Sequence, residues 1–513
     1  MPIFPTEAAP SQRRRDKGPS QSVPLFRPFK FADSSHLKPS PAMRVLPLNA
    51  DSSHRKPSPA IRMFPREMEA EIPGHGRSKR PTSTLSFDAD STREGSCQYP
   101  AWVILNRLGG RRDSLHGDGT TSAVSYTSGG EKVSVSFELA EPPRTSLVTL
   151  DWPRGPDPSE GSTSYPEVVA AHGSLVLLQI ISTDKGIIDY FVYDARASEK
   201  PSLTRLPICY WQGTSNRGKL RPRIMSNEAM GILSCSKDFF IVAELEKPNQ
   251  PFAANIYFLC SGSDDWRVFK DVPIPHEHDH SFPGLLLWST DAMLSYRHRY
   301  LIWVDYFSGM IVAKFAHPGD IDILNPQEPV LSYVPLPVEP FQGQPYEVDR
   351  GEVCPEASRS LCYTHDGIKF IDVNLHGSGS GFSITLWSWC GDQTWRQEAT
   401  LDAAQLWNLD SENRLPNGQP EFPVVDMDNP YIICFLLTEG HHIVSDPDAT
   451  TYMIKVHMKK KILVDFTTYS NKGSPSYHKS YMTSRMMSEG LSFISSEMPY
   501  YLSRQTKKRI LLV

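Results

Sequence analysis

Residues 298–315, HRYLIWVDYFSGMIVAKF, contain the pattern that decides the fold. Apolar residues fill both arms of this stretch and Tyr-Phe-Ser-Gly separates them, which is typical of a β-hairpin. We expect strands at 300–305 and 310–315, with Gly309 at positive φ in the turn between them. Apolar runs at 292–296 and 329–337 flank the hairpin, so four short strands follow one another here.

The same order of four short strands recurs in four other places. These units cover residues 167–207, 230–275, 360–401 and 422–466. The second strand recurs at steps of 64, 62, 67 and 63 residues, counted between Leu175, Phe239, Leu301, Ile368 and Tyr431. A looser set of runs at 101–106, 132–139 and 146–152 is a candidate sixth unit. No helical period lies between the units, so the sequence predicts an all-β fold.

A β-propeller of six four-stranded blades accounts for this repeat. One four-stranded sheet with two apolar faces cannot bury both faces alone, whereas blades stacked around an axis bury them against one another. The second strands are the most continuously apolar, as expected for strands that are covered on both faces. Trp303 lies in such a strand, so we expect its ring to pack between blades and not to stack on a ligand.

Residues 1–97 differ from the rest of the chain in composition. They contain 14 of the 44 prolines, and their 16 Lys and Arg against 10 Asp and Glu give a net charge of +6. The remaining residues therefore carry about −11 of the total charge of −5. Because the apolar residues in this part follow no period, the sequence predicts a disordered tail.

The tail also contains a tandem duplication of sixteen residues. Residues 32–47 recur at 50–65 with twelve identical positions. The repeat is either a paired Ser-Pro docking or phosphorylation site or a copy in an unconstrained segment, and we favour the second interpretation. The chain thus divides into a tail at 1–97, a propeller domain at 98–470 and a C-terminal extension at 471–513, which is either a closing strand or a tail.

Charge and cysteine content restrict the environment and the partners. The net charge of −5 gives no general attraction to nucleic acid or membrane surfaces. No run of eighteen apolar residues occurs, and the N-terminus has no apolar signal segment. The eight cysteines include no CxxC pair, which favours a reducing, intracellular location in cytoplasm or nucleus. We expect an unidentified protein as partner.

Several motifs follow one another along the chain: AWVILNRLGGRRD (101–113), PEVVAAHGSLVLLQ (166–179), MSNEAMGILSCSKDFFIVAELE (225–246), LIWVDYFSGMIVAKF (301–315) with SYVPLP (332–337), and IKFIDV with FSITLWSW (368–373 and 382–389). As a set, over about 100–470, they resemble the plant family of unknown function DUF1618, which is expanded in grasses. The resemblance implies no activity, cofactor or catalytic residue, because none is established for that family.

The segment HEHDH, residues 276–280, is the strongest candidate for a metal site. His276, His278 and His280 alternate, so in an extended chain successive rings lie on one side about 6.5–7 Å apart. That spacing is too wide for three imidazoles to reach one ion at about 2 Å unless the chain bends. We expect a solvated loop that needs no metal, and we assign no metal ligand and no cofactor.

Other segments with candidate chemistry are more simply explained as loops or buried thiols. RGKLRPR (217–223) has four basic residues in seven and is expected to be a solvated loop, the alternative being contact with phosphate or an acidic partner. GSGSGF (377–382) has no Lys-Ser/Thr after its glycines, and HHIVSDPD (441–448) resembles a hairpin loop. Cys354 and Cys362 lie near His365, but we expect buried, unreactive thiols.

Two classes of function are compatible with this pattern. The first is a non-enzymatic propeller that serves as a protein-interaction platform. The second is a propeller enzyme of hydrolase type with its site in the central funnel. Polar residues at equivalent strand-to-strand turns support the second class: His172, Asp238, His298, Asp366 and Asp428. Turns favour such residues in any case, so we favour the platform and name no catalytic residue.

Overall fold

The computed structural model describes residues 99–112, 119–155, 165–182, 187–196, 200–211, 220–247, 252–275, 285–316, 327–338, 355–376, 381–391, 394–438, 450–469 and 492–502. All of them lie within one compact unit, Met63–Val513. The expected tail at 1–97 and the segment 503–513 lie outside the described residues. None of the helices in the described ranges has the length and apolar character needed to span a membrane.

Five of the sheets have four antiparallel strands in chain order, as the repeat predicted. Their strands are β6 (Glu167–His172), β7 (Leu175–Ser182), β8 (Ile187–Asp194) and β9 (Ser202–Arg205); β10 (Met230–Ser234), β11 (Phe240–Glu246), β12 (Ala253–Cys260) and β13 (Arg267–Pro273); β14 (Ala292–Tyr296), β15 (Tyr300–Asp305), β16 (Gly309–Lys314) and β17 (Val330–Pro335); β18 (Arg359–Thr364), β19 (Gly367–His376), β20 (Gly381–Gly391) and β21 (Thr394–Asp402); and β22 (Glu421–Val425), β23 (Ile432–Thr438), β24 (Thr451–His457) and β25 (Ile462–Tyr469).

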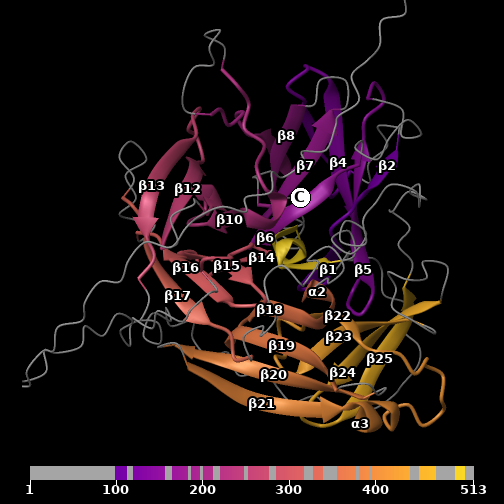
Figure 1. Cartoon of the computed structure of the whole chain (residues 1–513). Helices are drawn as coiled ribbons and strands as arrows, with labels where there is room; N and C mark the ends of the chain where they lie inside the picture. The colour runs from indigo at the N-terminus through magenta and orange to yellow at the C-terminus, as the bar shows by residue number, and fades with distance from the viewer. Residues whose placement is uncertain are drawn as a thin grey trace, which may run out of the picture. The chain divides into compact units, whose positions relative to one another are not determined.

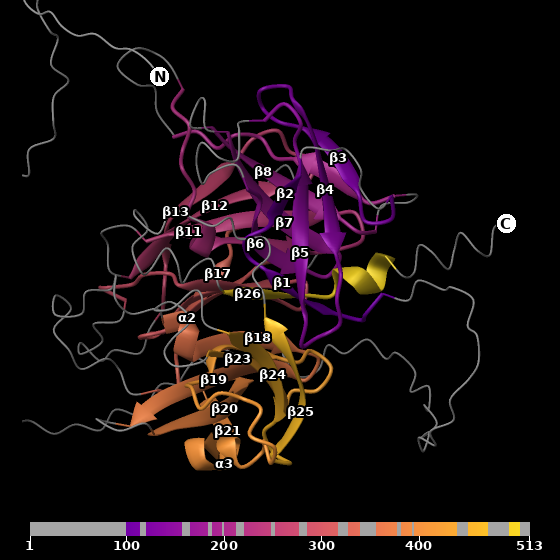
Figure 2. The same ribbon diagram turned by 90° about the vertical axis from the view of Figure 1, so that its right-hand side faces the viewer.

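The sixth sheet joins the two ends of the described chain. It contains β1 (Val103–Asn106), β2 (Gly110–Arg112), β3 (Ala123–Tyr126), β4 (Lys132–Glu138), β5 (Thr145–Asp151) and β26 (Phe493–Ser496). β26 pairs antiparallel with β1, next to which it lies in Figure 2. β26 lies beyond residue 470, where the sequence suggested that the propeller domain ends, and it is the strand that completes this sheet.

The sheets are the blades of a six-bladed β-propeller, so the predicted fold is confirmed. The first strands β6, β10, β14, β18 and β22 contact one another in this order, and β26 closes the ring between β22 and β6. Figure 1 looks onto the ring, with β13, β17, β21 and β25 at the periphery. Closure by a C-terminal strand leaves the ring without an open inner edge.

The core lies between blades, where apolar side chains of adjacent sheets pack together. Trp303 on β15 is fully buried among residues of β11, β12 and β16, which confirms its prediction as core. Its indole Nε1 donates to the carbonyl of Ala229, at 2.7 Å, so the ring's one polar group is satisfied. The short helices are η3 (Asn227–Ala229), α2 (Pro355–Ser358) and α3 (Ala403–Trp407).

The hairpin that indicated the fold differs from expectation in one respect. Gly309 does not have a positive φ, so that prediction is wrong. The position needs glycine because a Cβ there would lie 2.6 Å from the Val334 carbonyl oxygen and 2.7 Å from the Tyr333 ring. The turn itself is closed by Ser308 N, which donates to Asp305 O at 3.0 Å.

Candidate functional sites: the channel mouth and the arm

The inner strands enclose a central channel that holds a cavity of about 120 Å³. Its walls come from β6, β14, β18, β22 and β26 together with η3. The inner strands end on one side of the ring, in the turns that lead to the second strands. We call this end the turn-side mouth and define it by His172, His298, His365, Asp428 and Glu497.

The turn-side mouth brings together side chains from five of the six blades. The rings of His172 and His298 meet edge to face with centroids 5.3 Å apart. The Nε2 of His365 lies 3.4 Å from a carboxylate oxygen of Asp428 and 3.7 Å from one of Glu497. Glu497 is mostly buried and follows β26, so the closing strand delivers a carboxylate to the mouth.

The backbone of one residue, Ser234, orients both imidazoles of the histidine pair. Ser234 N–H donates to Nδ1 of His172 at 3.0 Å, and Nδ1 of His298 lies 2.6 Å from the Ser234 carbonyl oxygen. Burial, with the nearby charges of His298 and Arg196, lowers the pKa of His172 to about 3. His172 is therefore neutral at physiological pH.

The structure gathers only part of the predicted funnel set. His172, His298 and Asp428 are at the mouth, whereas Asp238 and Asp366 are exposed turn residues without contacts to the cluster among the described residues. His365 had been considered only as a partner for a cysteine, and Glu497 was not predicted at all. The missed carboxylate follows the closing strand, whose place in the ring no repeat spacing indicated.

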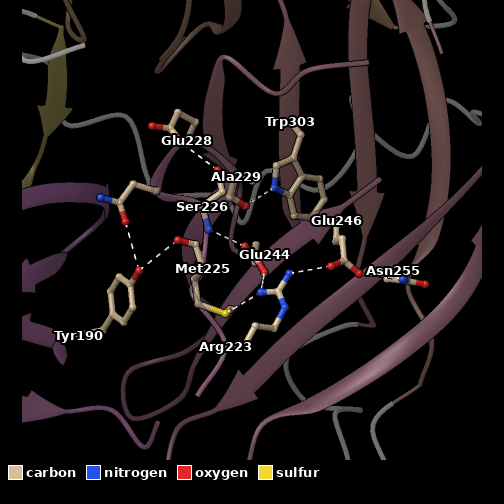
Figure 3. A network of polar contacts seen from close by, with 11 residues as sticks. Tyr190, Arg223, Met225, Ser226, Glu228, Ala229, Glu244, Glu246, Asn255 and Trp303 are labelled. Atoms are coloured by element: carbon tan, nitrogen blue, oxygen red, sulfur yellow. Dashed lines mark hydrogen bonds and ion pairs between the residues drawn. The ribbon is translucent and has the colours of Figure 1, made fainter. Parts of the chain in front are cut away.

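A second polar cluster lies between blades, around Arg223 at the end of the RGKLRPR segment (Figure 3). We call it the inter-blade network: Arg223, Met225, Ser226, Glu244, Glu246 and Asn255. Arg223 was expected in a solvated loop, but its side chain is only 4% exposed, so that prediction is wrong for this residue. Burial is tolerated because Glu244 and Glu246 both pair with the guanidinium.

All four carboxylate oxygens of the network accept hydrogen bonds. Glu244 accepts from Arg223 and from Ser226 N at 2.6 Å. Glu246 accepts from Arg223 at 3.1 Å and from Asn255 at 2.9 Å. The guanidinium also lies over Tyr257, 3.9 Å from the ring centroid. This arrangement holds the connection between β9 and β10 firmly against β11.

Burial disfavours the charged forms of Glu244 and Glu246. Their hydrogen-bond and ion-pair partners offset this effect to different degrees. Burial raises the pKa of the Glu244 carboxyl to about 7, against the opposing effect of Arg223 and the Ser226 amide. For Glu246, which is more exposed, hydrogen bonds from Asn255 and Arg223 outweigh burial and lower the pKa. The network is thus built to neutralise a buried cation.

The network anchors two paired segments, residues 207–211 and 220–225, which we call the arm. Tyr210 bridges to Pro222, Trp211 N donates to Arg221 O at 2.9 Å, and Arg223 N donates to Cys209 O at 2.8 Å. The arm exposes four large apolar side chains: Tyr210 (39%), Trp211 (44%), Leu220 (63%) and Ile224 (75%). Cys209 and Met225 at its base are buried.

The expected burial of Cys362 is confirmed, and its thiol contacts Ser360 Oγ at 3.1 Å. Burial raises the pKa of this thiol, which disfavours the reactive thiolate. HEHDH (276–280), HHIVSDPD (441–448), Cys354 and most of GSGSGF (377–380) lie outside the described residues. Within the ranges that are described, no group of three or more His, Cys, Asp or Glu could hold a metal ion.

The chain is therefore a β-propeller with two polar clusters, the inter-blade network and the turn-side mouth of the channel. Residues 303–434, from β15 to β23, match the family model "Protein of unknown function (DUF1618)", which confirms the resemblance over this part of the chain. No curated protein matches the chain.

Two solved structures are similar to the chain at low identity and low TM-score. The WD40 domain of SCAP from fission yeast is 11% identical, with 72% of this chain and 88% of that chain covered and a TM-score of 0.26. The α-L-arabinofuranosidase Arb93A from Fusarium graminearum, in complex with an iminosugar inhibitor, is 10% identical, with 70% and 99% covered and a TM-score of 0.27. Neither similarity bears on the function of this chain.

Proposed function

We propose that the chain is a non-enzymatic protein-interaction platform and that the arm is its contact surface. The observation that carries this proposal is the set of four exposed apolar side chains on one ribbon, at 39–75% exposure. Tyrosine, tryptophan and arginine contribute most of the binding energy in protein interfaces. A ribbon that is anchored by buried ion pairs presents them with little loss of entropy on binding.

The charge of the arm specifies the chemistry of the partner. Residues 207–225 contain Arg217, Lys219, Arg221 and Arg223 and no acidic residue. Arg223 is neutralised by Glu244 and Glu246, whereas Arg221 is exposed. The partner is therefore a protein with an apolar groove bordered by Asp and Glu. The tail at 1–97, with its charge of +6, does not have this character.

The test compares the arm with an equally exposed apolar pair elsewhere on the propeller. Ile462 and Val464 on the outer strand β25 are 47% and 44% exposed and serve as the control site. Proteins captured by the full chain are quantified for wild type, for Trp211→Ala with Ile224→Ser, and for Ile462→Ser with Val464→Ser. We expect partners that the arm variant loses and the control variant retains; equal capture by all three would refute the proposal.

A hydrolase with its site in the funnel is the second candidate function. The convergence of His298, His365 and Glu497 is the observation that favours it. Turnover of nitrophenyl esters and glycosides by the full chain, compared with the Glu497→Gln variant, separates the two functions. The platform proposal expects no turnover beyond that of the variant, whereas turnover that Glu497→Gln abolishes would establish an enzyme.

A further inference from the structure

We propose that the turn-side mouth binds a small, neutral, polyhydroxylated molecule such as a sugar or polyol. This site is separate from the arm and does not depend on the partner that the arm binds. The hydrogen-bonding groups, the charge and the backbone of the mouth support this proposal.

The two histidines present opposite hydrogen-bonding groups. Because Nδ1 of His172 accepts from Ser234 N–H, its proton is on Nε2, which is a donor. Because the Ser234 carbonyl can only accept, Nδ1 of His298 carries a proton, and in this tautomer Nε2 is an acceptor. Neither Nε2 has a hydrogen-bond partner among the described residues. His172, only 8% exposed, lines the channel cavity.

The carboxylates of the mouth have unused capacity to accept hydrogen bonds. Within the described part of the chain, Glu497 has a single ionic partner, His365, and at 3.7 Å that contact is longer than a hydrogen bond. Its side chain is only 23% exposed, and burial raises its pKa. A mostly buried carboxylate without a donor is a group that a ligand hydroxyl would satisfy.

The charges around the mouth largely cancel. Arg196 pairs with Asp194 at 3.6 Å and lies over the Tyr501 ring. Arg297 lies over the ring of Tyr296, 5.1 Å from its centroid, and Asp428 and Glu497 carry the opposite charge. Arg196, Arg297, Asp194, Asp428 and Glu497 together leave a single negative charge, and burial keeps His172 neutral. The mouth therefore does not require a highly charged ligand, and Tyr363, which lines the cavity and meets the ring of His365, offers aromatic surface beside the polar groups.

The turn that contains His298 adopts a backbone conformation that costs conformational free energy. Arg297 and His298 have φ angles of 47° and 50°, in the left-handed region. The corresponding turns after β6 and β18 place Gly173 and Gly367 at positive φ. Each non-glycine residue in this region costs about 1 kcal/mol, and such strain is found where a side chain must be aimed. Here the strained turn directs His298 to Ser234.

A hydroxyl group matches this array better than an ion does. It accepts from the Nε2–H of His172 and donates to Nε2 of His298 or to Glu497, whereas an ammonium only donates and a carboxylate only accepts. The channel cavity of about 120 Å³, which His172 and Glu497 line, has room for a small molecule with several hydroxyls. Vicinal hydroxyls allow contact with the histidine pair and the carboxylates at once.

Saturation-transfer NMR on the full chain tests the site. The probes are D-glucose, L-arabinose and glycerol, with putrescine and malonate as cationic and anionic comparisons, each at about 10 mM. We expect transfer to at least one hydroxylated probe and to neither charged probe. Transfer only to putrescine or malonate, or to no probe, would overturn the proposal.

Three variants locate the binding. His298→Asn tolerates positive φ and keeps a donor for Ser234 but has no acceptor at the position of the imidazole Nε2, while Glu497→Gln and Asp428→Asn keep the side-chain shape. Asp238→Asn, in the equivalent turn of another blade, is the matched control. We expect at least about tenfold weaker binding for the first three variants. The control variant should bind as tightly as the wild type. Equal binding by all four proteins would refute the site; Asp428, at 59% exposure, keeps the test valid if a buried substitution unfolds the chain.

Discussion

The inter-blade network and the turn-side mouth both contain buried carboxylates, but they differ in how completely these are paired. The four oxygens of Glu244 and Glu246 all accept hydrogen bonds, while among the described residues Glu497 has only the more distant His365, at 3.7 Å. A buried polar group that is fully paired stabilises the fold, whereas spare hydrogen-bonding capacity allows a group to meet a ligand. On our proposal, this difference distinguishes a structural cluster from a binding site within one propeller.

The largest effect is expected from the apolar core that lies beside the network. Trp303→Ala removes a fully buried ring and leaves the Ala229 carbonyl without its donor. We expect a loss of about 3–5 kcal/mol in the free energy of unfolding, measured by urea denaturation. A loss below about 1 kcal/mol would show that the ring is not core, and would reopen its role as a ligand-stacking residue.

Breaking the network tests whether its pairing is structural. Arg223→Met leaves Glu244 buried without its cation, and we expect a loss of about 3 kcal/mol in urea denaturation. Arg221→Met, two residues earlier and exposed, is the control and should change stability by less than about 0.5 kcal/mol. Adding Glu244→Gln to Arg223→Met should recover part of the loss; purely additive effects would contradict the ion-pair account.

The histidine of the mouth predicts a pH dependence. The pKa of His172 is about 3 in the folded chain and about 6.5 when unfolded, so the unfolded chain takes up the proton first as pH falls. The contribution of His172 to the free energy of unfolding is fully present above pH 6.5 and is lost progressively down to pH 3. About 2 kcal/mol of this contribution is lost between pH 7.5 and pH 5.

His172→Asn isolates this contribution, because asparagine still accepts from Ser234 N–H but does not titrate. The difference in unfolding free energy between the wild type and His172→Asn should therefore shrink by about 2 kcal/mol from pH 7.5 to pH 5. A difference that stays constant over this interval would mean that His172 does not titrate with a lowered pKa.

The smallest effect on stability is expected at Glu497. Burial raises the pKa of this carboxyl, so its charge is disfavoured in the folded chain. Glu497→Gln should leave the unfolding free energy at pH 7.5 unchanged or slightly higher, within about 1 kcal/mol, by urea denaturation. A loss as large as that of Arg223→Met would remove the distinction between the two clusters.

The sequence was sufficient to predict the blades because the strands of each blade are consecutive in the chain. Four strands within about 60 residues, with a nearly constant step, identified five sheets and part of the sixth. The closing strand Phe493–Ser496 could not be found in this way, since it pairs with β1 almost 400 residues earlier. The same separation explains why Glu497 was missed.

Arg223 shows a second limit of prediction from sequence. A basic run in a loop normally lies in solvent, and only the pairing of Arg223 with Glu244 and Glu246 on β11 reverses that expectation. No spacing in the sequence signals the contact. The histidines and Asp428 at the turns were predicted as candidates, but which of them converge depends on how the blades pack around the channel.

The interaction surface is tested most directly by the affinity of a captured partner for the purified full chain. Titration calorimetry compares the wild type with Trp211→Ala, whose ring is 44% exposed, and with Ile462→Ser on β25. The account predicts at least about tenfold weaker binding for Trp211→Ala, with unfolding temperature unchanged, and wild-type affinity for Ile462→Ser. Unchanged affinity for Trp211→Ala, or an equal loss for both variants, would contradict it.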